Sequence, residues 1–392
     1  MISVEEALAQ CLVLATPLAT EAVALRHAFG RMMPAAATAR RDQPPFAASA
    51  MDGYAVQGDP KPGDRFTVVA EAGAGHAFAG TVAAGQAVRI FTGAPVPQGA
   101  TRVVIQEDVS RSGDQITLSP NADTASHIRP AGQDFRIGDS LGPRRLTAND
   151  LALLAAMNIP EVAVTRRPVV ALIATGDELV MPGERPSTSQ IISSNPFALA
   201  AMIEAEGGTA RLLPIARDTE ADLRTVLTMA SDADLVVTIG GASVGDHDLV
   251  GRVTTGMGLQ RSFWKIAMRP GKPLMAGRLN GTPLLGLPGN PVSAVVCGHL
   301  FVLPMVRALQ ARPDPAPKPR RGRLGAAVDA NGPRAHYMRA RLSEAHDLPT
   351  VTPFDRQDSA LLSILSEANA LVIRPVGDGP HAAGDVVEYL PT

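Results

Sequence analysis

Two carboxylates close a glycine-rich segment in the second half of the chain. Residues 240–248 read GGASVGDHD. Gly240 and Gly241 could let backbone amides approach an anion closely, and Asp246 and Asp248 could hold a divalent cation through oxygen ligands. The alternative is a solvated Gly/Asp turn, in which His247 is a solvated loop residue and not an acid or base.

Three cations lie in the next loop along the chain. Residues 264–273 read WKIAMRPGKP and contain Lys265, Arg269 and Lys272. The chain has four lysines, and the other 32 of its 36 basic residues are arginines. Two of those four lysines fall within this one loop, where a compact ammonium could contact phosphate or another oxyanion. Chance placement on a solvated loop is the alternative.

Two further segments could complete an anion pocket. Residues 175–179 (TGDEL) follow a buried-type strand and place Asp177 and Glu178 at its end, either facing the pocket or capping a helix. Residues 287–291 (LPGNP) open a helix, whose free amides and dipole favour an anion. An ordinary capped helix is the alternative. In residues 334–342, the spacing of Arg339 and Arg341 favours a solvated strand face.

Composition excludes several classes of function. A chain of 392 residues predicts roughly two to four domains. A net charge of −2 and only 4% aromatic residues argue against a nucleic-acid partner and against an anionic membrane surface. Cys11 and Cys297 are the only cysteines, which fits a reducing cytoplasmic location. We find no signal peptide and expect no apolar stretch long enough to span a bilayer.

The order of sequence patterns predicts a multi-domain α/β plus β protein. Capping patterns predict helices over 3–15 and 147–158, and residues 20–40 are expected to be partly helical. We predict four domains. The first is a helical or linker domain formed by 1–41 with 143–167, and a β domain over 42–142 is inserted into it. A three-layer α/β domain with a mostly parallel sheet follows over 168–312, and a C-terminal β domain over 320–392. Asp218 is expected to cap the helix at 219–231.

Eight segments in consistent order resemble the molybdopterin molybdenumtransferase family, to which the E domain of gephyrin belongs. They are PPF with SAMDGYAV, IFTGAPVP, HIR with GQD, ATGDEL, QIISSN, GGASVGDHD, FWKIAMRPGKP and LPGNPVSA. The resemblance implies insertion of molybdate into adenylylated molybdopterin with release of AMP, assisted by Mg²⁺. It also implies an elongated homodimer with the site across the interface, and transient contact with a molybdopterin adenylyltransferase.

The same resemblance assigns roles to individual residues. It implies catalytic roles for Asp52, Glu178, Asp248, Lys265 and Lys272, and metal binding by Glu178, Asp246 and Asp248. The implied cofactor-binding residues are Thr92, Asp134, Asp218, Gly240, Gly241, Ser243, Arg269, Pro288, Pro291, Arg339 and Ser359. Arg269 stands where some members have lysine, which keeps the charge but replaces a point charge by a planar fork.

Three other functions remain open at this stage. The chain could be a molybdopterin adenylyltransferase, although that family carries a GGTG-type loop where residues 240–243 read GGAS. It could be a non-catalytic molybdopterin-binding scaffold, although scaffolding does not need both the carboxylates and the lysines. It could be an unrelated sugar-phosphate or nucleotide enzyme on the same sheet.

Overall fold

The computed structural model describes residues 1–241 and 249–392. Ser243, Asp246, His247 and Asp248 therefore lie outside the described residues. The chain forms two compact units, of which the first comprises 1–21, 30–34 and 164–392, and the second 22–29 and 35–163. The four-domain boundaries expected from the sequence remain a prediction.

The second unit contains a six-stranded sheet, so the prediction of β structure in this region is confirmed. Its strands, in spatial order, are β8 (Arg102–Ile105), β5 (Gly53–Val56), β7 (Gln86–Ile90), β6 (Arg65–Ala72), β10 (Gln115–Leu118) and β9 (Val109–Ser112). Alternate side chains pack into two separate apolar clusters, one around Tyr54 and Ile116 and the other around Ala55 and Ile90. Both faces of this sheet are therefore covered.

The capping patterns predict two helices correctly. In α1 (Val4–Leu14) the Ser3 hydroxyl accepts from the Glu6 amide, and the Glu6 carboxylate accepts from the Ser3 amide. Thr147 and Asp150 form the same reciprocal pair at the start of α2 (Ala148–Ala156). Each box satisfies backbone N–H groups that have no partner inside the helix.

The expectation of helix in residues 20–40 is wrong apart from a single 3-10 turn. This segment forms β1 (Thr20–Ala24), the turn Leu25–His27, β2 (Met32–Met33) and β3 (Ala37–Thr38). β1 pairs with β14 (Glu161–Thr165) and β3 with β12 (Ser140–Leu141). Pairing with strands far along the chain outweighs the local helix propensity of the alanines and arginines.

The first unit is built on a six-stranded sheet with a mixed arrangement. The order is β18 (Thr209–Leu212), β15 (Val169–Ala174), β19 (Leu235–Ile239), β23 (Thr282–Leu287), β22 (Met275–Leu279) and β20 (Leu259–Trp264). The first four strands are parallel, and β22 and β20 are antiparallel. The chain order changes direction between β15 and β19, and such switch points carry ligand sites beyond the carboxyl ends of the strands.

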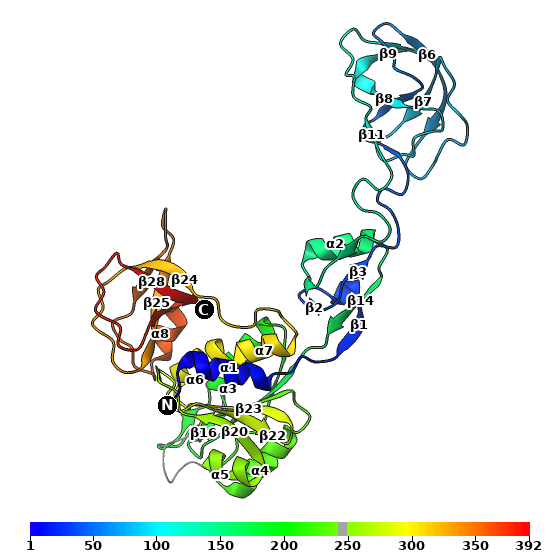
Figure 1. Ribbon diagram of the computed structural model, residues 1–392. Coiled ribbons are helices and arrows are strands. Elements are labelled where there is room, and N and C mark those ends of the chain that lie inside the picture. The colour runs from blue at the N-terminus through cyan, green and yellow to red at the C-terminus, as the bar shows by residue number, and fades with distance from the viewer. Residues whose placement is uncertain (242–248) are drawn as a thin grey trace. The chain divides into compact units, whose positions relative to one another are not determined.

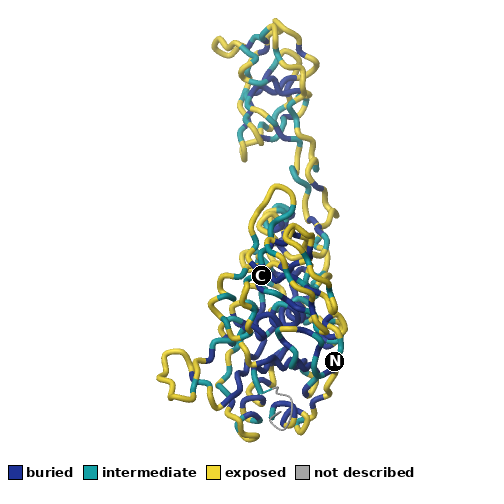
Figure 2. Tube along the Cα trace, turned by 90° about the vertical axis from the view of Figure 1, so that its left-hand side faces the viewer, coloured by how far each residue is buried: buried dark blue, intermediate teal, exposed yellow. Residues whose placement is uncertain are grey.

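Helices cover both faces of this sheet, which gives the predicted three layers (Figure 1). Helices α1, α3 (Asn195–Ala205), α6 (Pro291–Cys297) and α7 (Leu303–Leu309) contribute to one apolar core, and α4 (Glu220–Met229) and α5 (Leu249–Gly256) to the other. In Figure 2 the buried trace runs through the interior of this unit. Thr219 caps α4 by accepting from the Asp222 amide, so the prediction that Asp218 is the cap is wrong.

One helical run is apolar enough to cross a membrane by length and composition alone. It covers Pro291–Leu309, has 19 residues, and is 89% buried inside the protein. His299 and Arg307 interrupt the apolar character of this run. Because the run packs in the core through residues such as Val296, Phe301 and Met305, it is weak support for a membrane span.

The last part of the first unit is a closed β-barrel. β25 (Ala335–Ser343), β26 (Thr350–Pro353), β24 (Arg320–Leu324), β28 (Val386–Pro391) and β27 (Ala370–Arg374) follow one another, and β27 pairs back onto β25. The short strand β21 (Met268–Arg269), from the lysine-containing loop, adds to β25 in parallel. That loop thus joins the α/β sheet to the barrel.

Candidate functional site

A pocket of about 570 Å³ lies beyond the carboxyl ends of β15, β19 and β23. Its walls combine segments that are far apart in the sequence: residues 174–175 and 178–179, 191–196, 239–241, 288–291, Pro273 and Ala360. The pocket therefore occupies the switch point of the parallel part of the sheet. Of the predicted site residues, Glu178, Gly240, Gly241, Pro288 and Pro291 lie in its wall.

Gly240 and Gly241 form a wall that no other residue fits. Their φ angles are +94° and +63°. A Cβ on Gly240 would lie 2.8 Å from the Thr175 carbonyl oxygen, and one on Gly241 would lie 2.5 Å from Val250 Cγ2. The backbone of this turn is thus pressed against Thr175. The Thr175 hydroxyl is buried and has no hydrogen-bond partner among the residues that the structure describes, which leaves it available to a pocket ligand.

The TGDEL turn separates its two carboxylates. Glu178 is exposed on the pocket wall, whereas the Asp177 side chain accepts from the Asp218 amide at 3.1 Å. Arg217 donates to the carbonyls of Asp177 and Leu179. These bonds hold the turn so that Glu178 is its pocket-facing carboxylate. Asp218 is not in the pocket wall, and its observed contact is to Asp177.

Two helices begin at the pocket, α3 and α6. Pro196 and Pro291 occupy their first turns. The Asn195 side-chain amide donates to the Gly289 carbonyl at 2.7 Å, which ties the two helix starts together. Neither N-cap side chain, Ser194 or Asn290, bonds a helix amide. The amides of both first turns are therefore free of side-chain caps, and the positive ends of the dipoles favour an anion here.

The barrel supplies the remaining wall through the loop at 354–361. The Asn290 side-chain amide donates to the Ser359 hydroxyl at 2.9 Å, and the Val292 amide donates to the Ser359 carbonyl at 3.1 Å. Ser359 thus touches the start of α6, beside Ala360 in the pocket wall.

Arg339 supports the loop at 354–361 through hydrogen bonds to its backbone. Its guanidinium is 1% exposed and donates to the carbonyls of Arg356 and Leu361. Gln357 bonds both the amide and the carbonyl of Arg339, at 3.0 and 2.9 Å. Burial lowers the pKa of Arg339, and Asp358 opposes this effect. The prediction of a solvated strand face is therefore wrong for Arg339, because the loop covers it. It is right for Arg341, which pairs with Glu367 on the surface.

The three cations of the second loop are not equivalent. Lys265 has a φ of +70° and lies over the Trp264 ring with Nζ 4.0 Å from its centroid. Lys272 directly precedes the pocket residue Pro273, and neither lysine is itself in the pocket wall. Arg269 turns to the barrel instead, where it donates to the Asn331 side-chain oxygen at 3.1 Å. The structure thus keeps the lysines near this wall and places Arg269 at another pocket.

In the second unit, two predicted residues form one pair. A single oxygen of Asp52 accepts from both the amide and the hydroxyl of Thr92, at 2.7 and 2.9 Å. These bonds lower the pKa of Asp52, with a smaller contribution from Arg89. Asp52 is therefore held ionised, in a partly exposed position. Asp134 lies elsewhere in this unit, in a pocket of about 580 Å³ with Arg129.

Of the three predicted metal ligands, only Glu178 can be located, because Asp246 and Asp248 lie outside the described residues. Across 1–241 and 249–392, no three His, Cys, Asp or Glu side chains gather in a metal-binding group. Glu178 is an exposed carboxylate on the pocket wall, which fits one ligand of a Mg²⁺ ion that keeps several waters.

Sequence reasoning missed four residues of this site. Thr175, Asn195, Asn290 and Gln357 each line or support the pocket. Asn290 stood at a predicted helix start, so its place was foreseeable although its partner was not. Gln357 carries no sequence signal, because its role depends on Arg339 in a distant strand.

The fold and this pocket define a class: a multi-domain protein with a molybdopterin-binding type of α/β domain. Residues 2–158 match the MoeA N-terminal region (domains I and II), 171–308 match a probable molybdopterin binding domain, and 321–392 match the MoeA C-terminal region (domain IV).

Curated relatives and solved structures agree with this class. A molybdopterin molybdenumtransferase from Nostoc sp. is 34% identical over 95% of this chain and 88% of its own length. Molybdopterin molybdenumtransferase 2 from Mycobacterium tuberculosis is also 34% identical, over 92% of each chain. The crystal structure of a molybdopterin biosynthesis MoeA protein from Pyrococcus horikosii has a TM-score of 0.84 at 29% identity, covering 100% of this chain and 99% of that one. The chain belongs to the molybdopterin molybdenumtransferase family and is an enzyme of molybdenum cofactor biosynthesis.

Proposed function

We propose that this enzyme inserts molybdate into adenylylated molybdopterin and releases AMP, with Mg²⁺ as the assisting cation. The observation that carries the proposal is the pocket at the switch point. There one carboxylate, a glycine wall and two helix starts meet a serine-bearing loop from the barrel. Such a site suits a substrate with several anionic oxygens beside a hard cation.

We assign the residues roles according to the chemistry of their side chains and backbone groups. The Gly241 amide and the positive dipole ends of the helix starts at Pro196 and Pro291 would face anionic oxygens of the substrate. The Gly240 amide already donates to the Leu287 carbonyl at 3.0 Å, and the Val292 amide to the Ser359 carbonyl at 3.1 Å. Lys265 and Lys272 would neutralise the charge that develops on the phosphoryl group. Ser359 would donate to the molybdate, since its hydroxyl already serves as acceptor for Asn290.

Mg²⁺ would be held by Glu178, with Asp246 and Asp248 as its further ligands. When bound, the ion would polarise a phosphate oxygen as a Lewis acid. Asp52, kept ionised by Thr92, would accept a hydrogen bond from the pterin or from the attacking water.

We propose in addition that the enzyme works as a homodimer with the site shared across the interface, and that an adenylyltransferase delivers its substrate in a transient contact. A reducing cytoplasmic location accords with Cys11 and Cys297, which are both free and buried.

The test combines purified enzyme with adenylylated molybdopterin, magnesium and molybdate, and measures AMP and active cofactor together. We expect both products, each dependent on molybdate. Glu178→Gln should reduce both without loss of fold. Glu204→Gln changes an exposed carboxylate on α3 outside the pocket and should behave as wild type.

Other results would assign another function. Tight binding of the intermediate without AMP release, together with unchanged cofactor yield in Glu178→Gln, would indicate a scaffold. Transfer of AMP from ATP to molybdopterin would indicate an adenylyltransferase.

A further inference from the structure

Arg89, in strand β7 of the second unit, contacts two aromatic rings. Its guanidinium carbon lies 5.0 Å from the ring centroid of Tyr54 and 4.8 Å from that of Phe91. Tyr54 is the register partner of Arg89 on the neighbouring strand β5, and Phe91 directly follows β7. Because a planar guanidinium is attracted to aromatic faces, these two contacts restrict the position of the Arg89 side chain.

The nitrogens of Arg89 bond the segment that carries Asp52. Nη1 donates to the Gly53 carbonyl at 3.2 Å, and Nη2 donates to the Gln106 side-chain oxygen at 2.6 Å. The Gln106 amide in turn donates to the Asp52 carbonyl at 3.0 Å, and its side-chain nitrogen donates to Glu107 at 3.1 Å. Arg89 therefore supports the backbone at 52–53 both directly and through Gln106.

The second ring that Arg89 contacts belongs to the segment that carries Thr92. Phe91 precedes Thr92, whose amide and hydroxyl both donate to one oxygen of Asp52. The other oxygen of Asp52 accepts no hydrogen bond from the residues that the structure describes. Arg89 thus connects the two segments that meet in the Asp52–Thr92 pair, and this pair leaves one carboxylate oxygen open to a ligand.

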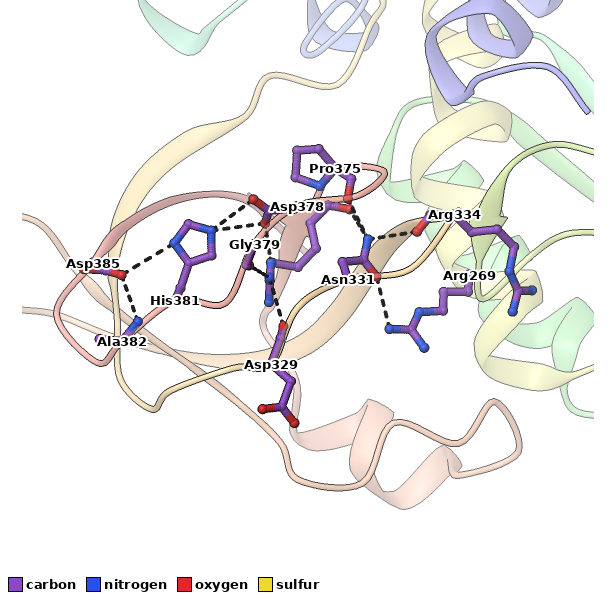
Figure 3. A network of polar contacts seen from close by, with 11 residues as sticks. Arg269, Asp329, Asn331, Arg334, Pro375, Asp378, Gly379, His381, Ala382 and Asp385 are labelled. Atoms are coloured by element: carbon purple, nitrogen blue, oxygen red, sulfur yellow. Dashed lines mark hydrogen bonds and ion pairs between the residues drawn. The ribbon is translucent and has the colours of Figure 1, made fainter.

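Arg89 forms no ion pair with a carboxylate in 1–241 or 249–392. Arg374 in the barrel shows the contrasting arrangement: it is 2% exposed and donates through Nε to Asp378, which also contacts His381 (Figure 3). The charge of Arg89 instead acts on Asp52 without direct contact. The two bonds from Thr92 lower the pKa of Asp52 most, burial opposes them, and the charge of Arg89 adds to the lowering.

We propose that Arg89 is a positioning residue for Asp52, which holds the Asp52–Thr92 pair so that the open carboxylate oxygen faces the substrate. Arg89 acts through Gly53, Gln106 and Phe91, and does not itself touch the reacting groups. The planar fork matters because it reaches two acceptors while its face contacts the rings, which a lysine ammonium cannot do. The inference rests on the function proposed above only in assigning Asp52 a substrate contact.

Carboxyl NMR titration of the full-length protein without substrate gives the first test. Arg89→Gln should raise the pKa of Asp52 towards the usual aspartate value. Arg89→Lys keeps the charge and should still raise this pKa, because the Thr92 bonds that lower it most would be loosened. Arg111→Gln is the matched control and should change nothing, since Arg111 is an exposed arginine of the same sheet that donates to the Gly113 carbonyl.

AMP release gives the second test. Arg89→Gln should lower kcat/KM roughly tenfold, which is within the loss of up to about 100-fold that a misplaced group can cause. In an Asp52→Asn background, Arg89→Gln should cause no further loss of the residual activity, because a positioning residue acts only through the group that it positions. A residue that merely stabilises the sheet would lower the activity again in that background.

The proposal is overturned if a folded Arg89→Gln protein keeps the wild-type pKa of Asp52 and the wild-type kcat/KM. It is also overturned if Arg89→Lys keeps the wild-type pKa of Asp52, since charge alone would then suffice, or if the losses multiply in the double variant. Should urea unfolding show that Arg89→Gln does not fold, Arg89→Lys carries both measurements. Absence of AMP release by the wild-type enzyme would contradict the proposed reaction instead, and the titration, which needs no substrate, would still decide whether Arg89 holds the pair.

Discussion

Asn290, at the start of a core helix of the α/β domain, donates its side-chain amide to the hydroxyl of Ser359 in the barrel over 2.9 Å. A second bond, from the Val292 amide to the Ser359 carbonyl, lies beside it. These two bonds attach the loop at 354–361 to the rim of the pocket. The barrel thereby completes a site that the parallel sheet begins.

Ser359→Ala should lower the molybdate-dependent rate by roughly 2- to 13-fold, the range given by one net hydrogen bond of about 0.5–1.5 kcal/mol. The loss should appear mainly in the KM for molybdate, measured by AMP release. Ser363→Ala, on the exposed part of the next helix, should be neutral. An unchanged KM for Ser359→Ala would remove the hydroxyl from the molybdate contact.

Lys265→Ala should reduce kcat by roughly tenfold or more, because a positioned charge near the phosphoryl group is lost. Lys318→Ala is a suitable control, since Lys318 is an exposed lysine paired with Asp314 in the linker. Full activity of Lys265→Ala would exclude this lysine from the mechanism.

Gly241→Ala should destabilise the protein by more than about 1 kcal/mol, because alanine is strained at positive φ and its Cβ would clash with Val250 and Thr175. Gly281→Ala isolates the contribution of strain: its φ is +92°, with no atom within 4 Å of the new Cβ. Urea unfolding of both variants measures the difference. Equal losses in the two would mean that the close approach to Thr175 contributes nothing.

Thr92→Ala should raise the pKa of Asp52 towards the usual value for aspartate, since it removes one of the bonds that lower it. Because the folded-state pKa is depressed, the stabilisation exists above the unfolded pKa and disappears as pH falls through the folded pKa. The free energies of unfolding of wild type and variant should therefore differ most above the usual aspartate pKa and become equal in acid. Carboxyl NMR titration and pH-dependent unfolding measure the two effects. A pKa of Asp52 unaffected by the substitution would contradict the assignment.

Glu206→Gln should destabilise the protein by about 1–3 kcal/mol, because Arg307 and Arg312 would lose their shared carboxylate. Burial raises the pKa of Glu206, but the two arginines outweigh it and the net shift is downward. The decrease in the free energy of unfolding should therefore be largest near neutral pH and should disappear as pH falls below the folded-state pKa of Glu206. Urea unfolding from pH 7 to pH 3 follows it.

Glu220→Gln provides the comparison for that measurement. Glu220 and Arg224 form an exposed pair on one helix face, and such pairs contribute about 0.2–1 kcal/mol. If both variants lose an equally small free energy of unfolding, the contact between Glu206 and its two arginines does not stabilise the fold more than an exposed pair.

Local patterns determined much of the fold. The capping boxes at Ser3 and Thr147, the short strands of the predicted β domain and the buried-type strand before TGDEL depend on residues close in sequence, and the structure has each of them. The glycine pair at 240–241 and the helix start at Pro291 could likewise be predicted as pocket features, because positive φ and first-turn proline are local properties.

Contacts between distant segments decided the rest. Residues 20–40 follow their strand partners and not their helix propensity. Arg339 is buried because a loop that begins fifteen residues later folds over it. Arg269 lies apart from the neighbouring lysines because strand pairing with His336 directs it to the barrel. A charge in a sequence predicts that an anion can bind, but the tertiary pairing of strands decides in which pocket.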